Sequence, residues 1–134
     1  MKYPVLVLRN TEENNYLFSV VDVPGCQVKA LTMDEGLILL NEAMASHLKV
    51  LVEYGEKVPH AKTIEEHMLL SSVASPIWAI LDFDIIPYMG KSNKINVTLP
   101  ELLIKQIDDR VAKSSKYKTR SGFIALACSA ELKH

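Results

Sequence analysis

The chain has 134 residues, enough for one domain or two small ones, and its composition, about half hydrophobic and a quarter charged, excludes a disordered protein. No apolar run reaches the roughly 18 residues that cross a bilayer, and the N-terminus lacks the apolar region of a secretion signal, so we expect a cytoplasmic protein without a membrane segment. The net charge of −1 hides two opposite parts, because residues 1–88 hold six Lys and Arg against twelve Asp and Glu, whereas residues 89–134 hold nine against four.

The first part of the chain predicts a β-hairpin and a third strand. Tyr3 to Arg9 and Tyr16 to Val21 are rich in β-branched and aliphatic residues, and the polar run Asn10 to Asn15 between them is typical of a turn. Pro24-Gly25 predicts a second turn. Gln27 to Ala30 can then form the third strand.

Two helices are expected next. Thr32 and Glu35 have the spacing of a capping box, in which the side chains satisfy free amides at a helix start. Leucine and methionine residues recur at intervals of three and four along residues 37–51 and give one apolar stripe, and Gly55 predicts the end of this helix. Thr63 to Glu66 predicts the start of a short second helix.

A fourth strand is expected after these helices. Ile77 to Ile86 is dense in apolar and β-branched residues, and Pro87 ends the pattern. Because side chains alternate along a strand, Asp82 and Asp84 should lie on the same face.

The domain organisation follows from a short polar segment. Residues 88–93 are small, polar and turn-prone, and they coincide with the change in the sign of the charge. We therefore expect a first domain at residues 1–87 and a second at residues 94–134. The two cysteines, Cys26 and Cys128, lie in different domains without metal-like spacing, so we expect both to be buried as small apolar residues.

The clearest pattern lies in the second domain, where residues 94–99 alternate between apolar and polar side chains. Such alternation predicts a strand with one packed and one exposed face. Pro100 steers the residue before it to extended geometry and suits the first position of a helix, so the strand should run directly into a helix. The apolar face holds Ile95, Val97 and Leu99, and the polar face holds Lys94, Asn96 and Thr98.

Two helices complete this domain. Apolar residues at helical spacing over residues 103–111 predict the first, and the basic loop Lys113 to Lys118 leads to Thr119, the expected N-cap of the second. No glutamate follows at the third helical position, so the free amides and the positive end of this helix predict an anion site. The residues of this site are Lys118, Thr119, Arg120 and Ser121.

The second domain is also too small to fold alone. About 40 residues with a single strand bury little apolar surface, and a lone strand leaves an open hydrogen-bonding edge. Two copies of residues 94–99 paired antiparallel solve both problems and form a ribbon that the major groove of B-DNA admits. We expect a homodimer through this domain, and two dimers can join as a tetramer.

Residues 93–133 resemble a ribbon-helix-helix DNA-binding domain. The resemblance rests on the pattern Ile-x-Val-x-Leu-Pro, the two helices and the Thr-Arg-Ser-Gly-Phe opening of the second helix. It implies binding of double-stranded operator DNA, with bases contacted by Lys94, Asn96 and Thr98 and phosphates by Lys118, Thr119, Arg120 and Ser121. A strand and helical pair that only dimerise are the alternative.

Residues 1–87 resemble the N-terminal domain of HicB antitoxins. The resemblance rests on Tyr3-Pro4-Val5, the hairpin, the turn Asp22 to Cys26 and the helix start Thr32 to Gly36, and a ribbon-helix-helix domain is a known companion of this domain. It implies an α+β fold with a small antiparallel sheet related to a reduced RNase H. It also implies an antitoxin that inhibits a small RNA-cleaving HicA toxin and represses the shared promoter. The turn at residues 10–15 departs from the family because it lacks glycines.

The acidic charge of the first domain supports the inhibitor role, because a toxin that binds RNA should expose a basic surface. We expect the toxin interface to include Asp82 and Asp84, together with Asp22. Two other functions remain open: a ribbon-helix-helix repressor whose first domain senses a ligand, and a metal-dependent nuclease that uses these three aspartates.

Catalysis and metal binding are not expected. The strand Tyr3 to Arg9 contains no carboxylate, although two-metal nucleases need several that converge. The four histidines, His47, His60, His67 and His134, show no ligand-like cluster, and His47 and His67 are expected on helix surfaces. The sequence thus predicts a protein without enzymatic activity, metal or cofactor.

Overall fold

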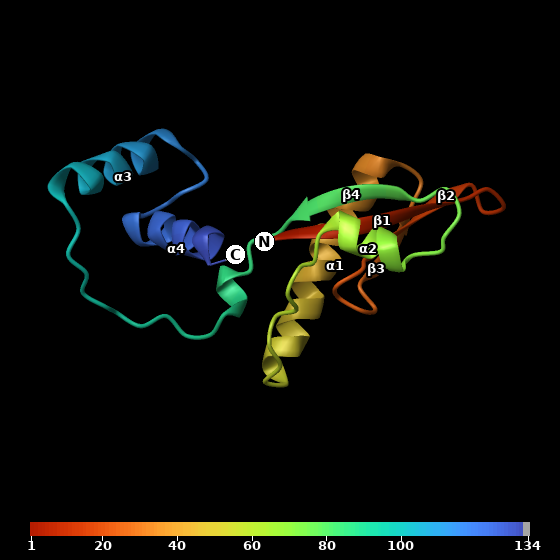
Figure 1. The fold of residues 1–134 in the computed structure, drawn as a ribbon, viewed down its shortest axis with the longest axis horizontal. Coiled ribbons are helices and arrows are strands. Elements are labelled where there is room, and N and C mark those ends of the chain that lie inside the picture. Colours follow the sequence, from red (N-terminus) through yellow and green to blue (C-terminus); the bar gives the residue numbers. More distant parts are fainter. Residues whose placement is uncertain (133–134) are drawn as a thin grey trace. The chain divides into compact units, whose positions relative to one another are not determined.

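The computed structural model describes residues 1–132, and two compact units divide the chain into Met1–Gly90 and Lys91–His134 (Figure 1). The last two residues of the expected DNA-binding domain, including His134, lie outside the described residues. No helix in the described part is long and apolar enough to cross a membrane. The elements are β1 (Lys2–Asn10), β2 (Asn15–Val20), β3 (Gln27–Ala30), α1 (Met33–Glu53), α2 (Ile64–Leu70), β4 (Ile77–Asp82), the 3-10 helix η1 (Ile86–Tyr88), α3 (Glu101–Lys113) and α4 (Arg120–Glu131).

Unit 1 is an antiparallel sheet with the strand order β3-β2-β1-β4, which confirms the expected α+β class. In this register Val7 of β1 faces Phe18 of β2 on one side and Ile77 of β4 on the other. Long helix α1 covers one face of the sheet with the apolar stripe expected from the sequence. The core between them includes Tyr3, Val5, Val7, Phe18, Val20, Leu40, Met44 and Leu48.

Helix α1 starts as its sequence predicts and packs unusually close to the sheet. The Thr32 hydroxyl accepts a hydrogen bond from the Glu35 amide at 3.2 Å, which satisfies one of the free amides at the helix start. Gly36 follows in the first turn, where a Cβ atom would overlap the ring of Phe18. Glycine is therefore required here by the close approach of the helix to β2.

The hairpin turn between β1 and β2 forms without glycine. Asn14 has a φ of 53°, a left-handed conformation that asparagine tolerates better than most residues. The Asn10 carboxamide oxygen accepts hydrogen bonds from the amides of Glu12 and Glu13 at 3.1 and 3.2 Å. Asparagine side chains thus supply the turn geometry locally.

Strand β4 is shorter than expected, because it ends at Asp82 rather than Ile86. The alternation of buried and exposed side chains nevertheless continues as far as Ile85, and one more backbone pair forms, in which the Phe83 amide donates to Met1 O at 2.9 Å. The chain then turns into η1.

Unit 2 consists of two helices and an extended segment. In the described chain residues 94–99 belong to no sheet, although we expected a strand there, because a strand needs a neighbour and unit 2 offers no second one. Ile95 and Val97 are 80% and 62% exposed. Pro100 occupies the N-cap of α3 rather than its first helical position. Cys128 on α4 is exposed, which corrects the expectation that both cysteines are buried.

Replacement of Gly36 by alanine tests the close packing of α1. Alanine favours a helix over glycine by about 1 kcal/mol, but the overlap with Phe18 should outweigh this gain and leave unit 1 less stable by about 1–3 kcal/mol. Urea unfolding followed by circular dichroism measures the change. The double variant G36A/F18L should recover part of the loss, and a G36A protein as stable as the wild type would show that the packing is not tight.

Candidate functional site

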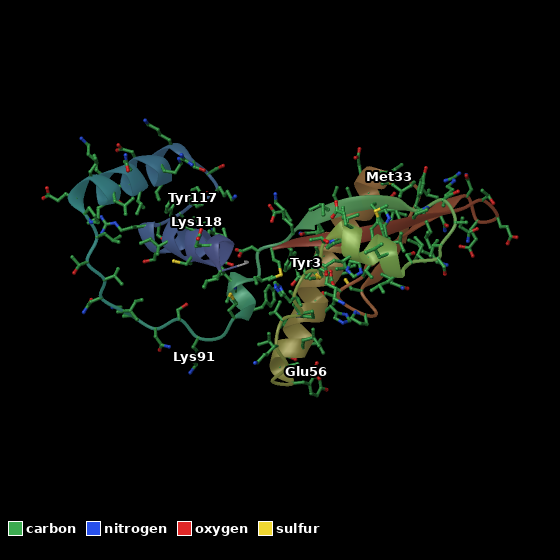
Figure 2. All side chains as sticks on the ribbon, viewed as in Figure 1. Tyr3, Met33, Glu56, Lys91, Tyr117 and Lys118 are labelled. Atoms are coloured by element: carbon green, nitrogen blue, oxygen red, sulfur yellow. The ribbon has the colours of Figure 1, made fainter. Side chains whose placement is uncertain are left out.

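The residues that we expect to bind an anion lie at the start of α4. The Thr119 hydroxyl accepts a hydrogen bond from the Gly122 amide at 3.0 Å, so Thr119 is the N-cap that the sequence predicts. The ring of Tyr117 packs edge-on against Phe123 with centroids 4.9 Å apart, and this contact fixes the preceding loop on α4. Lys118 is exposed just before α4 (Figure 2). Ser121 is exposed in the first turn of α4.

Arg120 is held by the other helix of unit 2. Its Nε and Nη2 atoms donate to the two carboxylate oxygens of Asp108 on α3 at 2.9 and 2.7 Å. The hydrogen bonds from Arg120 hold the pKa of Asp108 below its usual value, and Asp108 in turn raises the pKa of Arg120. The sequence did not reveal this pair, because the residues lie on different helices. It joins the start of α4 to α3.

The polar residues expected to contact DNA bases are all accessible. Lys94, Asn96 and Thr98 are exposed in the extended segment that leads to α3. Their apolar neighbours Ile95 and Val97 are exposed as well, so neither face of the segment is packed within one chain.

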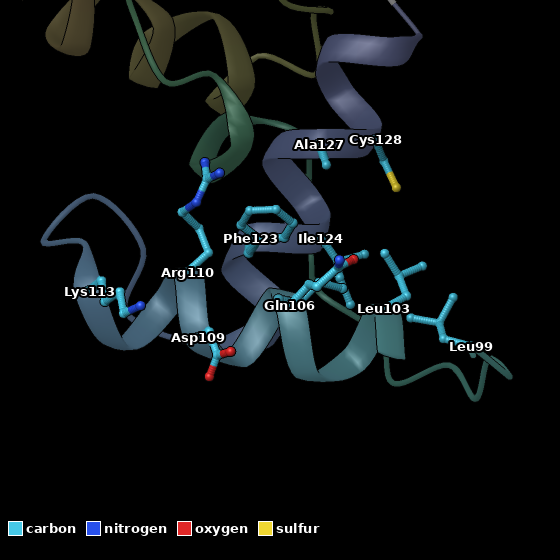
Figure 3. A pocket seen from close by; sticks show the side chains of 11 residues that line it. Leu99, Leu103, Gln106, Asp109, Arg110, Lys113, Phe123, Ile124, Ala127 and Cys128 are labelled. Carbon is cyan, nitrogen blue, oxygen red and sulfur yellow. The ribbon is translucent and has the colours of Figure 1, made fainter. Parts of the chain in front are cut away.

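A groove of about 650 Å³ runs between α3 and α4 (Figure 3). Its floor is apolar and its rim carries the charged side chains of Asp109, Arg110 and Lys113. Ile107 is the sole buried residue among those described in unit 2. The apolar lining consists of Leu99, Leu103, Ile107, Phe123, Ile124, Ala127 and Cys128.

In unit 1 Asp22 and His67 form a buried pair. His67 Nε2 lies 3.0 Å from one oxygen of Asp22, and the other oxygen accepts the Lys62 amide at 3.2 Å. The His67 ring stacks on Trp78 of β4, with centroids 6.2 Å apart and planes 16° apart. The expectation that His67 lies on a helix surface is therefore wrong. The pair joins α2 and its preceding loop to the sheet.

The burial of Asp22 removes it from the candidate contact residues, because its side chain is only 4% exposed and both oxygens are occupied. The pKa of the Tyr3 phenol is raised to about 12. Burial of the phenol is the larger cause, and the negative charge of Asp22 is the second. The Tyr3 hydroxyl donates to Pro59 O at 2.7 Å and holds the loop before α2.

Asp82, the last residue of β4, and Asp84 just beyond the strand are both exposed, whereas Phe83 between them is buried. The two aspartates therefore lie on the same side of the chain, as the sequence predicts. Asp82 lies 3.9 Å from the N-terminal amine, and an oxygen of Asp84 accepts the Ile86 amide at 3.0 Å. Asp22 points inward instead, so these three residues do not form the metal site of a nuclease. Across residues 1–132 no group of three or more His, Cys, Asp or Glu side chains could hold a metal ion.

Comparisons with known proteins agree with the family expected from the sequence. Residues 3–128 match the family described as "HicB_like antitoxin of bacterial toxin-antitoxin system". A 14.9 kDa protein from the rep-hol intergenic region of Haemophilus phage HP1 is 34% identical over 125 residues, which cover 93% of this chain and 92% of that protein.

Two solved structures share the fold. The antitoxin HicB of Burkholderia pseudomallei is 32% identical, with a TM-score of 0.67 over 96% of both chains. A chain in a structure described as a HicA3 and HicB3 toxin–antitoxin complex is 21% identical, with a TM-score of 0.50 over 63% of this chain and 99% of that one. The second likeness concerns the fold alone.

Removal of the Asp22 carboxylate should destabilise unit 1. In an Asp22→Ala variant the buried His67 ring and the Lys62 amide lose their acceptor, which should cost about 1–3 kcal/mol of unfolding free energy. Urea unfolding followed by Trp78 fluorescence measures the loss. Asp82→Ala is the control, because that carboxylate is exposed and its removal should leave the unfolding midpoint unchanged. Equal midpoints for the two variants would contradict a structural role of Asp22.

Proposed function

Because the chain belongs to the HicB-like antitoxin family, we propose that it neutralises a small HicA-like RNA-cleaving toxin and represses its own operon by binding operator DNA. The match over residues 3–128 is the observation that supports this most strongly. The two tasks fall to the two units, which carry opposite charges. Neither task requires catalysis by this chain.

Dimerisation of unit 2 is the first step of the DNA-binding proposal. A lone unit 2 leaves Ile95, Val97 and the apolar groove in water, although burial of such surface is the main driving force of folding. In a dimer residues 94–99 of two chains pair antiparallel, and α4 of one chain covers the groove of the other. This pairing also satisfies the backbone hydrogen bonds of the extended segments.

The paired segments then read DNA. Their polar faces present Lys94, Asn96 and Thr98 of each chain to the major groove, where side-chain donors and acceptors distinguish base pairs. The start of α4 binds the flanking phosphates through its free amides and through Lys118, Thr119 and Ser121.

Arg120 can pair with Asp108 and bind a DNA phosphate at the same time. Two of its nitrogen atoms are engaged by Asp108, and an arginine carries five N–H donors, so donors remain for a phosphate. The ion pair restricts the side chain and thereby orders the site before DNA arrives.

Toxin neutralisation falls to unit 1. The structure of a HicA3 and HicB3 toxin–antitoxin complex, in which one chain shares this fold, supports a toxin as the partner. Residues 1–88 carry six more acidic than basic residues, and a protein that binds RNA presents a basic surface, so the charges of the two proteins are complementary.

Co-expression with the toxin tests this half of the proposal. A short basic protein encoded beside this gene should arrest growth when it is expressed alone. Co-expression of this chain should restore growth, and the two proteins should co-purify. Persistent growth arrest without a complex would contradict the antitoxin role.

Replacement of Asn96 by alanine should relax the base preference of DNA binding. The loss of one amide side chain should reduce discrimination by about 1–3 kcal/mol at one position of each half-site. Competition binding with operator variants, each carrying one changed base pair, measures this. A uniform loss across all sequences would show that Asn96 contacts the backbone instead.

Replacement of Lys118 by alanine should reduce the affinity for DNA without changing the base preference. Binding should weaken about equally for all sequences, and the slope of log affinity against log salt should become shallower by about one for each phosphate that the protein no longer neutralises. Fluorescence anisotropy across a salt series measures the slope. An unchanged slope would exclude phosphate binding by Lys118.

A further inference from the structure

Strand β4 forms an unprotected edge of the sheet in unit 1. It pairs with β1 on one side, and no other described segment pairs with its outer side. The opposite edge strand, β3, has only four residues and carries Lys29, which is ion-paired with Glu13 at 3.3 Å. Short and charged edges resist further pairing, whereas β4 has no charged residue before Asp82. The β4 edge is therefore able to accept an additional strand.

An exposed apolar surface lies beside this edge. His67 is buried, and its stacking on Trp78 places α2 next to β4 (Figure 1). The three residues that follow His67 in the last turn of α2 are all exposed. We define the α2–β4 surface as Met68, Leu69, Leu70, Val73, Ile77 and Ile80, all of which are exposed. Met68, Leu69, Leu70 and Val73 follow one another closely along the chain, whereas Ile77 and Ile80 flank the β4 edge on opposite faces because side chains alternate along a strand. Neighbouring exposed apolar side chains favour a binding site.

The charges around this surface favour one kind of partner. Residues 63–90 contain Glu65, Glu66, Asp82 and Asp84 and no lysine or arginine. A second copy would bring two such acidic segments together, and a nucleic acid would be repelled. A basic protein is attracted by the same charges.

From the open edge, the apolar side chains and the charge, we infer that the α2–β4 surface docks a basic protein, which adds a strand to β4 and packs apolar side chains on Leu69 and Leu70. This partner is the toxin, so the inference rests on the proposed function. Backbone hydrogen bonds along β4 provide affinity, and the apolar turn of α2 provides specificity.

Substitution of Leu69 tests the surface in the full chain. Leu69 is 88% exposed, so neither Leu69→Lys nor Leu69→Glu should affect folding, and both should weaken toxin binding about tenfold or more. Leu31→Lys is the matched control, because Leu31 is a comparably exposed apolar residue that precedes α1, and it should leave the affinity unchanged. Isothermal titration with the purified toxin measures these affinities.

Hydrogen exchange tests whether the toxin adds a strand to β4. Toxin binding should slow amide hydrogen exchange in residues 77–82, because an added strand accepts and donates hydrogen bonds along the outer edge of β4. Unchanged exchange in β4 in the complex would overturn strand addition.

The outcomes separate this inference from the proposed function. If the wild-type chain binds the toxin and Leu69→Lys binds it equally well, the α2–β4 surface is not the docking site, while the antitoxin role stands. If the wild type binds no toxin, both fail. A lower oligomeric mass of Leu69→Lys without toxin would assign the surface to self-association instead and would also overturn the inference.

Discussion

The scarcity of apolar surface that unit 2 can bury on its own is the constraint on which its proposed function depends. Its two helices bury Ile107 and leave the floor of a 650 Å³ groove open, and the extended segment before them packs neither face. Burial of apolar area is the dominant favourable term in folding, and we therefore propose that a second copy completes the core of this unit. The same pairing would create the DNA-reading ribbon, which couples folding of the unit to DNA binding.

Unit 1, in contrast, encloses an apolar core within a single chain. Its sheet and α1 enclose a continuous apolar core, and the buried hydrogen bond between Asp22 and His67 ties α2 and its preceding loop to the sheet. A stable framework of this kind can present a fixed acidic surface to a partner. The opposite charges of the two units keep the proposed tasks apart, because DNA is repelled by one unit and a basic protein by the other.

Sequence patterns predicted the features that depend only on residues close together in the chain. The bounds of β3, the caps Thr32 and Thr119 and the stripe of α1 follow from alternation, capping and helical spacing, which need only neighbouring residues. The Asp22–His67 pair spans 45 residues and the Arg120–Asp108 pair joins two helices, so neither could be predicted from local pattern. The structure forms no strand at residues 94–99, and under our proposal that strand would require a second chain. The family expected from the motifs is confirmed by the match over residues 3–128.

The mass of the full-length protein in solution tests the pairing of unit 2 most directly. Sedimentation equilibrium should give twice the 15.0 kDa of one chain, or a higher even multiple. An Ile124→Asp variant, which places a charge in the groove, should lower that mass by disrupting the pairing of unit 2. A wild-type mass of 15.0 kDa with fully formed α3 and α4, or an Ile124→Asp variant with unchanged mass, would contradict the pairing.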